Sequence, residues 1–267
     1  MSDILSAPRP VTPLGILVDQ LGDLLARAGG IDPVLREDLK EAYDLAAGLD
    51  PYLERHASPE SPALAALAAA TAVHDWGSHD GAVPLEQEML SGHVEGQLLK
   101  MLVHATRARH VLEVGMFTGY SALAMAEALP ASGRVVACEL DPGVADFARA
   151  CFAASEAGSR VEVRVGPAAG TLAELAAAGA VFDLVFVDAD KAGYTGYLDA
   201  ILRHDLLAPH GLICVDNTLM QGQPWASADP PPNGVAVAAF NTAVAADPRV
   251  EQVIVPLRDG LTLIRRA

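Results

Sequence analysis

Seven short apolar runs alternate with helical patterns from about residue 109 to the end of the chain, and this alternation restricts the possible folds most strongly. Strand followed by helix, repeated, is typical of a doubly wound parallel sheet. The last two runs are separated only by Leu257-Arg258-Asp259-Gly260, which suffices for a hairpin and not for a helical crossover, so we expect them to be antiparallel neighbours. The expected strands are His110–Val114, Arg134–Glu139, Arg160–Val165, Phe182–Val187, Leu212–Val215, Val250–Pro256 and Leu261–Arg265.

Helical patterns fill the segments between these strands and most of the preceding sequence. Breaks are expected at Gly29-Gly30, at Asp50-Pro51 and in the loop 77–84, and a long loop is expected at Thr218–Asn233. We therefore predict an N-terminal helical extension over residues 1–84, followed by one α/β domain over residues 85–267. The expected helices are Leu14–Ala28, Pro33–Ala47, Pro59–Val73, Leu85–Thr106, Ser121–Leu129, Gly143–Ser155, Ala169–Ala178, Gly193–Leu206 and Gly234–Ala245.

Composition excludes several classes of function. The net charge is −16 without a cluster of lysine or arginine, which argues against nucleic-acid binding. The longest apolar stretch, Pro62–Val73, falls short of the roughly twenty residues that a membrane span needs. With no apolar signal region near the start, we expect a cytoplasmic chain. Cys138, Cys151 and Cys214 are odd in number and lack CxxC spacing, so neither disulfides nor zinc are expected.

The stretch Phe182–Lys191 carries the clearest chemical signal. A continuous apolar run, typical of a strand buried on both faces, ends in Asp188, Asp190 and Lys191. Ligands and catalytic groups gather at the carboxyl ends of such strands. The chain has three lysines against fifteen arginines, and lysine is the cation that can lose its proton. We interpret Lys191 as a candidate for proton transfer, while a solvated cluster of charges remains the alternative.

A strand runs into a glycine-bearing turn and a helix at Val111–Ser121. Such a turn brings backbone N–H groups against a ligand. Its GxxxG spacing differs from the GxGxxG of dinucleotide binding, which disfavours a nicotinamide-dependent dehydrogenase. Glu139 ends the next strand, 24 residues after Gly115, where an acid can accept the hydroxyls of a ribose. A structural turn with an incidental acid is the alternative.

Polar side chains also follow the strand after Phe182–Val187. Asp216 and Asn217 end it, so together with Asp188 they supply three oxygen donors from two neighbouring strands. Oxygen ligands suit Mg²⁺ or a similar hard cation, and two carboxylates at adjacent strand ends would repel without one. Asn217 alone is also an ordinary turn residue.

These motifs together resemble the cation-dependent O-methyltransferases, the group that includes catechol and caffeoyl-CoA O-methyltransferases. The resemblance covers roughly residues 85–266 through LEVGMFTGYSALAMAEALP, CELDP, FDLVFVDADKAGY, VDNTLMQG and ADPRVEQVIVPLRDGLTLIRR, in that order. It implies a Rossmann-like fold of the S-adenosylmethionine (SAM)-dependent methyltransferases: a seven-stranded, mostly parallel sheet with an antiparallel C-terminal hairpin strand. It further implies a divalent cation, most simply Mg²⁺, and a homodimer.

The same resemblance implies roles for individual residues. Asp188, Asp216 and Asn217 would hold the metal, and Lys191 would be the general base, with Asp188 beside it in catalysis. A chain that had lost catalysis and kept only a binding role would be expected to lack one of these four. The residues implied in cofactor binding are Ser91, Glu113, Gly115, Tyr120, Ser121, Glu139, Ala168, Asp188 and Asp190.

A narrower resemblance extends over nearly the whole chain, to the O-methyltransferases of mycosporine and gadusol biosynthesis. It rests on PxTPLGILVDQL, LAAGLDPYL and LEQEMLSGHVEGQLLKMLVH. It implies a small cyclohexenone substrate whose neighbouring oxygens resemble those of a catechol. The strongly acidic chain shows no evident basic cluster for an anionic CoA thioester, which favours this substrate. A catechol or phenolic secondary metabolite is the alternative.

Overall fold

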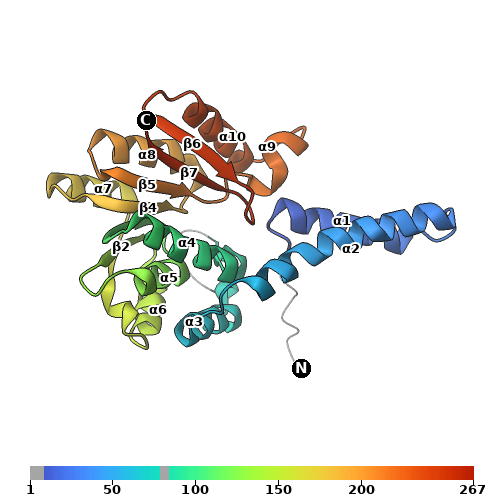
Figure 1. Cartoon of the computed structure of the whole chain (residues 1–267), viewed down its shortest axis with the longest axis horizontal. Helices are drawn as coiled ribbons and strands as arrows, with labels where there is room; N and C mark the ends of the chain where they lie inside the picture. The colour runs from blue at the N-terminus through green and yellow to red at the C-terminus, as the bar shows by residue number, and fades with distance from the viewer. Residues whose placement is uncertain (1–8, 79–83) are drawn as a thin grey trace.

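A seven-stranded sheet forms the centre of the computed structural model, which describes residues 9–78 and 84–267 (Figure 1). The strand order is β3-β2-β1-β4-β5-β7-β6. β1 to β5 pair in parallel, and β7 is antiparallel to both of its neighbours. The predicted fold class and the C-terminal hairpin are therefore confirmed. The strands are β1 His110–Val114, β2 Arg134–Glu139, β3 Val161–Val165, β4 Phe182–Val187, β5 Leu207–Val215, β6 Val250–Val255 and β7 Leu261–Arg266.

Helices cover both faces of the sheet (Figure 1). Side chains alternate along β1, so that Val111 packs into one core with α4, α5 and α6, and Leu112 packs into the other with α7, α8 and α10. Both side chains are fully buried, as the continuous apolar run predicts. The helices are α4 His93–Thr106, α5 Tyr120–Ala128, α6 Pro142–Phe152, α7 Ala168–Ala177, α8 Tyr194–Arg203, α9 Gln223–Ala226 and α10 Pro232–Ala245.

Three further helices precede this body. α1 (Pro13–Arg27) and α2 (Pro33–His56) form a helical hairpin that projects away from the sheet (Figure 1). Thr12 and Asp32 cap their amino ends through backbone N–H groups, and neither helix has a buried residue. α3 (Pro62–Val73) instead packs into the core beside α5. A helix that precedes residue 84 in the sequence therefore belongs to the packing of the sheet domain. The division at residue 84 stays a prediction, and residues 79–83 of the expected loop lie outside the described residues.

Proline did not end the second helix where we expected. α2 continues through Pro51 to His56, beyond the predicted end at Ala47. Proline removes one N–H from the helix ladder, which usually breaks or kinks it. Because every residue of α2 lies at least partly at the surface, water can satisfy the carbonyl that loses its partner.

Other boundaries also differ from the prediction. The expected helix Leu85–Thr106 is interrupted: a short 3₁₀ turn, η2 (Gln87–Met89), precedes α4, and Gly92 lies between them with φ 78° and ψ −179°. That conformation is accessible to glycine alone, which explains the break. β5 starts five residues before Leu212, because Leu207 pairs with Phe182 across a register shift.

The expected long loop Thr218–Asn233 is partly helical. It contains a 3₁₀ turn, η5 (Met220–Gly222), and the four-residue α9. The prediction of a loop is wrong there because the segment lacks apolar periodicity; hydrogen bonds from the Thr218 and Leu219 N–H groups to the C-terminal hairpin hold its start. None of the described helices combines the length and the apolar character that crossing a membrane requires.

Truncation of Leu67 tests whether α3 is part of the main core. Leu67 is 1% exposed, so Leu67→Ala should lower the free energy of unfolding by about 2–5 kcal/mol through lost burial and a residual cavity. Leu45 on α2 is 82% exposed, and Leu45→Ala should change it by no more than about 0.5 kcal/mol. Urea unfolding measures both, and equal small effects would contradict the placement of α3 in the core.

Candidate active site

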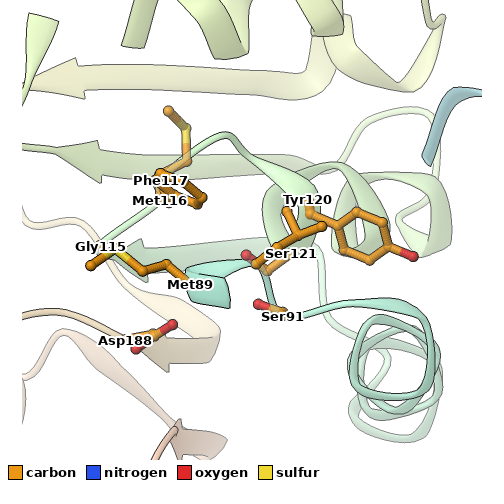
Figure 2. Close-up of a pocket in the computed structure, with 9 residues that line it drawn as sticks. Met89, Ser91, Gly115, Met116, Phe117, Tyr120, Ser121 and Asp188 are labelled. Carbon is orange, nitrogen blue, oxygen red and sulfur yellow. The ribbon is translucent and has the colours of Figure 1, made fainter. Parts of the chain in front are cut away.

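A pocket lies at the carboxyl ends of β1 and β4, against the segment that precedes α4 (Figure 2). Ser91 and Ser121 face the same space, and Asp188 lies across it (Figure 2). Five of the residues predicted to bind the cofactor thus line one pocket: Ser91, Gly115, Tyr120, Ser121 and Asp188. Its remaining lining residues are Met89, Leu90, Met116 and Phe117.

Gly115 brings the ends of β1 and β4 together. It has φ 90°, and a Cβ there would lie closer to the Asp188 carbonyl oxygen than any non-bonded contact allows, and only 3.0 Å from the Ala189 Cα. The Asp188 N–H donates to the Val114 carbonyl over 2.9 Å at the same point. Glycine is therefore required by both the backbone conformation and the approach of the neighbouring strand.

Glu113 is a buried acid in contact with Ser121, which lines the pocket. The Ser121 hydroxyl donates to its Oε1 over 2.5 Å, while Oε2 has no hydrogen-bond partner among the described residues. Burial raises the pKa of Glu113 well above its usual value, against the opposing effect of Ser121, and Asp188 raises it further. An unpaired buried oxygen can accept a hydrogen bond from a polar ligand that reaches it.

Glu139 lies beside the turn that follows β1. Its Oε2 accepts the Phe117 N–H at 2.8 Å and its Oε1 accepts the Asp141 N–H at 2.9 Å. Burial raises the pKa of Glu139, and the backbone hydrogen bonds partly oppose that rise. The carboxylate is therefore fixed at the carboxyl end of β2, next to pocket-lining Phe117.

Tyr120 lines the pocket less directly than the other four, and Asp190 and Ala168 are not among its lining residues. The Tyr120 ring turns away from it (Figure 2), and its hydroxyl donates to Glu60. Asp190 is exposed and accepts a hydrogen bond from the Tyr197 hydroxyl at 2.5 Å. Ala168 begins α7, whose amino end has no side-chain cap. Their roles in cofactor binding stay predictions.

Lys191 holds the predicted metal ligands together. Its Nζ donates to Asp188 Oδ1 at 2.9 Å, to Asn217 Oδ1 at 2.5 Å and to the Tyr194 hydroxyl at 2.7 Å. Asn217 Nδ2 donates to Asp216 Oδ2 at 3.1 Å, and Tyr194 donates to the Asp216 carbonyl at 2.9 Å. The structure therefore brings all four predicted residues into one cluster.

Acidic groups dominate the electrostatics of this cluster. Burial would lower the pKa of Lys191, but the charge of Asp188 and the contact with Tyr194 outweigh it and raise that pKa, so Lys191 is an ammonium here. Burial, followed by the charge of Asp188, raises the pKa of Asp216 to about 7. Burial and then Asp216 raise the pKa of Glu95 well above its usual value.

The donor chemistry fits a hard cation. Asp188 and Asn217 direct oxygens at a positive charge, the Lys191 ammonium, and Asp216 adjoins them. Among the described residues, no three histidine, cysteine, aspartate or glutamate side chains cluster as a metal site. The predicted set combines two carboxylates with the amide oxygen of Asn217, a combination that Mg²⁺ accepts. Asn217 has φ 56°, a backbone conformation that asparagine tolerates well.

Sequence reasoning missed three residues at this site. Tyr194 follows Lys191 by three positions, and its place at the start of α8 was the available signal. Glu95 and Arg258 form an ion pair of 3.4 Å between α4 and the β6–β7 turn. No sequence pattern links two residues so far apart in the chain.

Comparison with known proteins agrees with this geometry. A family model described as O-methyltransferase matches residues 55–267. A caffeoyl-CoA O-methyltransferase of Petroselinum crispum is 35% identical over 224 residues, which cover 80% of this chain and 88% of that protein.

Solved structures agree as well. The SAH-bound methyltransferase of Podospora anserina aligns with TM-score 0.71 and 28% identity, covering 84% of this chain and 96% of its own. An O-methyltransferase of Streptomyces achromogenes involved in tomaymycin synthesis, in complex with SAM, aligns with TM-score 0.70 and 29% identity, covering 82% and 96%.

Fold and site together define the class of SAM-dependent methyltransferases. Within that class, the chain belongs to the O-methyltransferase family and is of the caffeoyl-CoA O-methyltransferase type. The family predicted from the sequence motifs is thereby confirmed.

Substitution of Gly115 tests the close approach of β1 and β4. Gly115→Ala should destabilise the protein by about 1–3 kcal/mol or more, because the methyl group meets the β4 backbone and φ is unfavourable. Gly170 in α7 has no heavy atom within 4 Å of an added Cβ, so Gly170→Ala should be neutral or stabilise by up to about 1 kcal/mol. Thermal melting compares them, and equal melting temperatures would disprove the constraint.

Proposed function

We propose that this O-methyltransferase uses SAM and a divalent cation to convert demethyl-4-deoxygadusol to 4-deoxygadusol, a step of mycosporine-like amino acid biosynthesis. One observation carries the proposal. The pocket lined by Ser91, Gly115 and Ser121 adjoins, through Asp188, the oxygen cluster formed with Asp216 and Asn217. A methyl donor and a chelated acceptor oxygen would therefore lie on opposite sides of Asp188.

Cofactor binding is assigned to the pocket at the ends of β1 and β4. Glu139 would accept the ribose hydroxyls, and Gly115, with Ser91 and Ser121, would lie against the methionine part. The unpaired Oε2 of Glu113 supports a polar ligand here. Bound SAM supplies an electrophilic methyl group, and the contribution of these residues is to hold it in line with the acceptor.

Asp188, Asp216 and Asn217 would hold the cation. A bound divalent cation acidifies a coordinated oxygen and fixes its direction. Repulsion by Asp188 contributes, after burial, to raising the pKa of Asp216 to about 7. A cation bound to both carboxylates would therefore stabilise their charged forms. Mg²⁺ is proposed because all three donors are hard oxygens.

Lys191 is assigned proton transfer at the same oxygen. Its Nζ lies within 2.9 Å of two proposed ligand oxygens, so any acceptor oxygen bound there would be close to it. In the present arrangement the Lys191 side chain is protonated, so it must lose a proton before it can act as a base. It can also orient and stabilise an ionised acceptor oxygen without accepting a proton.

A small substrate with two neighbouring oxygens suits the charges around the cluster. Asp188, Asp216 and Glu95 lie together, and the cations Lys191 and Arg258 act against the negative charge of this group. The phosphate charges of a CoA thioester would meet this field unfavourably, whereas a cyclohexenone carries at most the single charge of its ionised enol, which the cation would stabilise. The alternative is a catechol or phenolic substrate, which the similarity to caffeoyl-CoA O-methyltransferases favours.

The N-terminal helices are proposed to form the interface of a homodimer and to cover the substrate. α2 exposes an apolar face through Val34, Leu45, Leu49 and Tyr52, separate from the face that packs on α1. Mass measurement by light scattering tests this, since a monomer at working concentration would contradict it.

An assay with three substrates tests the proposed function. The purified protein with SAM and Mg²⁺ should methylate demethyl-4-deoxygadusol with a kcat/KM higher than for catechol or caffeoyl-CoA, as read from product masses. EDTA should abolish turnover, and Mg²⁺ or Mn²⁺ should restore it. Preference for caffeoyl-CoA would establish the alternative substrate, and full activity after exhaustive chelation would reject the cation.

Lys191→Arg separates proton transfer from charge. Arginine keeps the positive charge but cannot deprotonate in a protein. If Lys191 is the base, turnover should fall roughly 10²–10⁴-fold while SAM and Mn²⁺ binding persist. The fall should be larger with a catechol than with the more acidic cyclohexenone enol. Equal, small losses on both substrates would show that Lys191 acts only through its charge.

A further inference from the structure

The β6–β7 turn, residues 257–260, holds the segment that follows the proposed metal ligands. The Thr218 N–H donates to the Gly260 carbonyl over 3.0 Å, and the Leu219 N–H donates to the Asp259 carbonyl over 2.8 Å. Asp259 Oδ1 also accepts the Gln221 N–H at 2.5 Å. One wall of the site is thus fixed to this turn by three hydrogen bonds to backbone N–H groups.

Arg258, in the same turn, reaches the opposite wall. Its Nη2 donates to the Leu90 carbonyl over 3.2 Å, and its Nε lies 3.4 Å from Glu95 Oε2. A Cβ at Gly92 would lie 2.9 Å from Nη1, so the guanidinium rests against the backbone there. Leu90 and Ser91 both line the pocket. The guanidinium therefore contacts the segment on both sides of Ser91.

Two further observations show that this contact is costly to form. Glu95 is 2% exposed, so its carboxyl depends on nearby partners, and Arg258 is the cation that pairs with it. Arg258 also has φ 48°, a left-handed conformation that is unfavourable for arginine. Backbone strain retained at a functional site is a sign that the side chain is needed there.

We propose that Arg258 is a positioning residue that holds the segment 90–95 closed over the SAM pocket, and that the β6–β7 turn thereby joins the two walls of the site. The proposal rests on the proposed function, because it takes the pocket beside Ser91 as the SAM site. Arg258 touches neither of the reacting groups. Its contribution is to keep Ser91 in place for the cofactor.

Arg258→Met keeps much of the side-chain volume but removes the charge and the donors. The dissociation constant for SAM, measured by calorimetry on the full chain, should rise about 10- to 100-fold, the expected effect of losing charge-assisted hydrogen bonds. Mn²⁺ affinity should stay equal or increase, because a positive charge near Asp216 is lost. A general loss of structure would weaken both, and SAM binding within twofold of the unmodified chain would overturn the proposal.

A double variant removes the alternative that Arg258 only neutralises a buried acid. Arg258→Met with Glu95→Gln also removes the charge of the acid that pairs with Arg258 but still lacks the contact with Leu90, so SAM binding should remain weak. Recovery of SAM affinity in the double variant would overturn the proposal. If the single variant fails to fold, the double variant decides. Arg265 pairs with exposed Glu251 in the same hairpin, so Arg265→Met is the matched control and should bind SAM normally.

Two reference measurements separate this proposal from the proposed function. The unmodified chain should bind SAM, and Glu139→Ala should weaken that binding by removing the ribose acceptor. If both hold and Arg258→Met binds SAM normally, only the role of Arg258 fails. If the unmodified chain does not bind SAM, the assignment of the pocket itself fails.

Discussion

The close approach of β1 and β4 at Gly115 determines where every other group of the site can lie. Because no side chain separates the two strand ends, Asp188 faces both the turn after β1 and the oxygens that follow β5. The pocket and the acidic cluster therefore share one residue. A larger residue at position 115 would force the strands apart and separate the two halves of the site.

Buried charge is the second determinant. Glu95, Asp188 and Asp216 lie together against the cations Lys191 and Arg258, and burial raises the pKa values of Glu95 and Asp216. A buried carboxylate needs a partner, either a cation or a proton. An arrangement with more acids than cations is less favourable for folding than a neutral core, and such arrangements are typical of binding sites.

The sequence predicted the sheet and much of the site, because both follow from short-range patterns. Apolar runs define strands, and parallel strand ends meet at one edge, so the sequence alone predicts that Asp188, Asp216 and Asn217 lie together. The end of α2 was mispredicted because proline tolerance depends on exposure, which no local pattern encodes. The Arg258 contact was missed for a different reason: Leu90 and Arg258 are 168 residues apart.

The C-terminal hairpin explains how so distant a contact arises. β7 runs antiparallel to β5, with Thr262 paired to Val215, so β7 begins where β5 ends. The turn before β7 must therefore lie at the carboxyl edge of the sheet, beside Asp216. A final parallel strand would place its preceding connection at the opposite edge, away from the ligand site. The reversal of one strand thus supplies the site with a turn that can contact both the segment after β5 and the segment before α4.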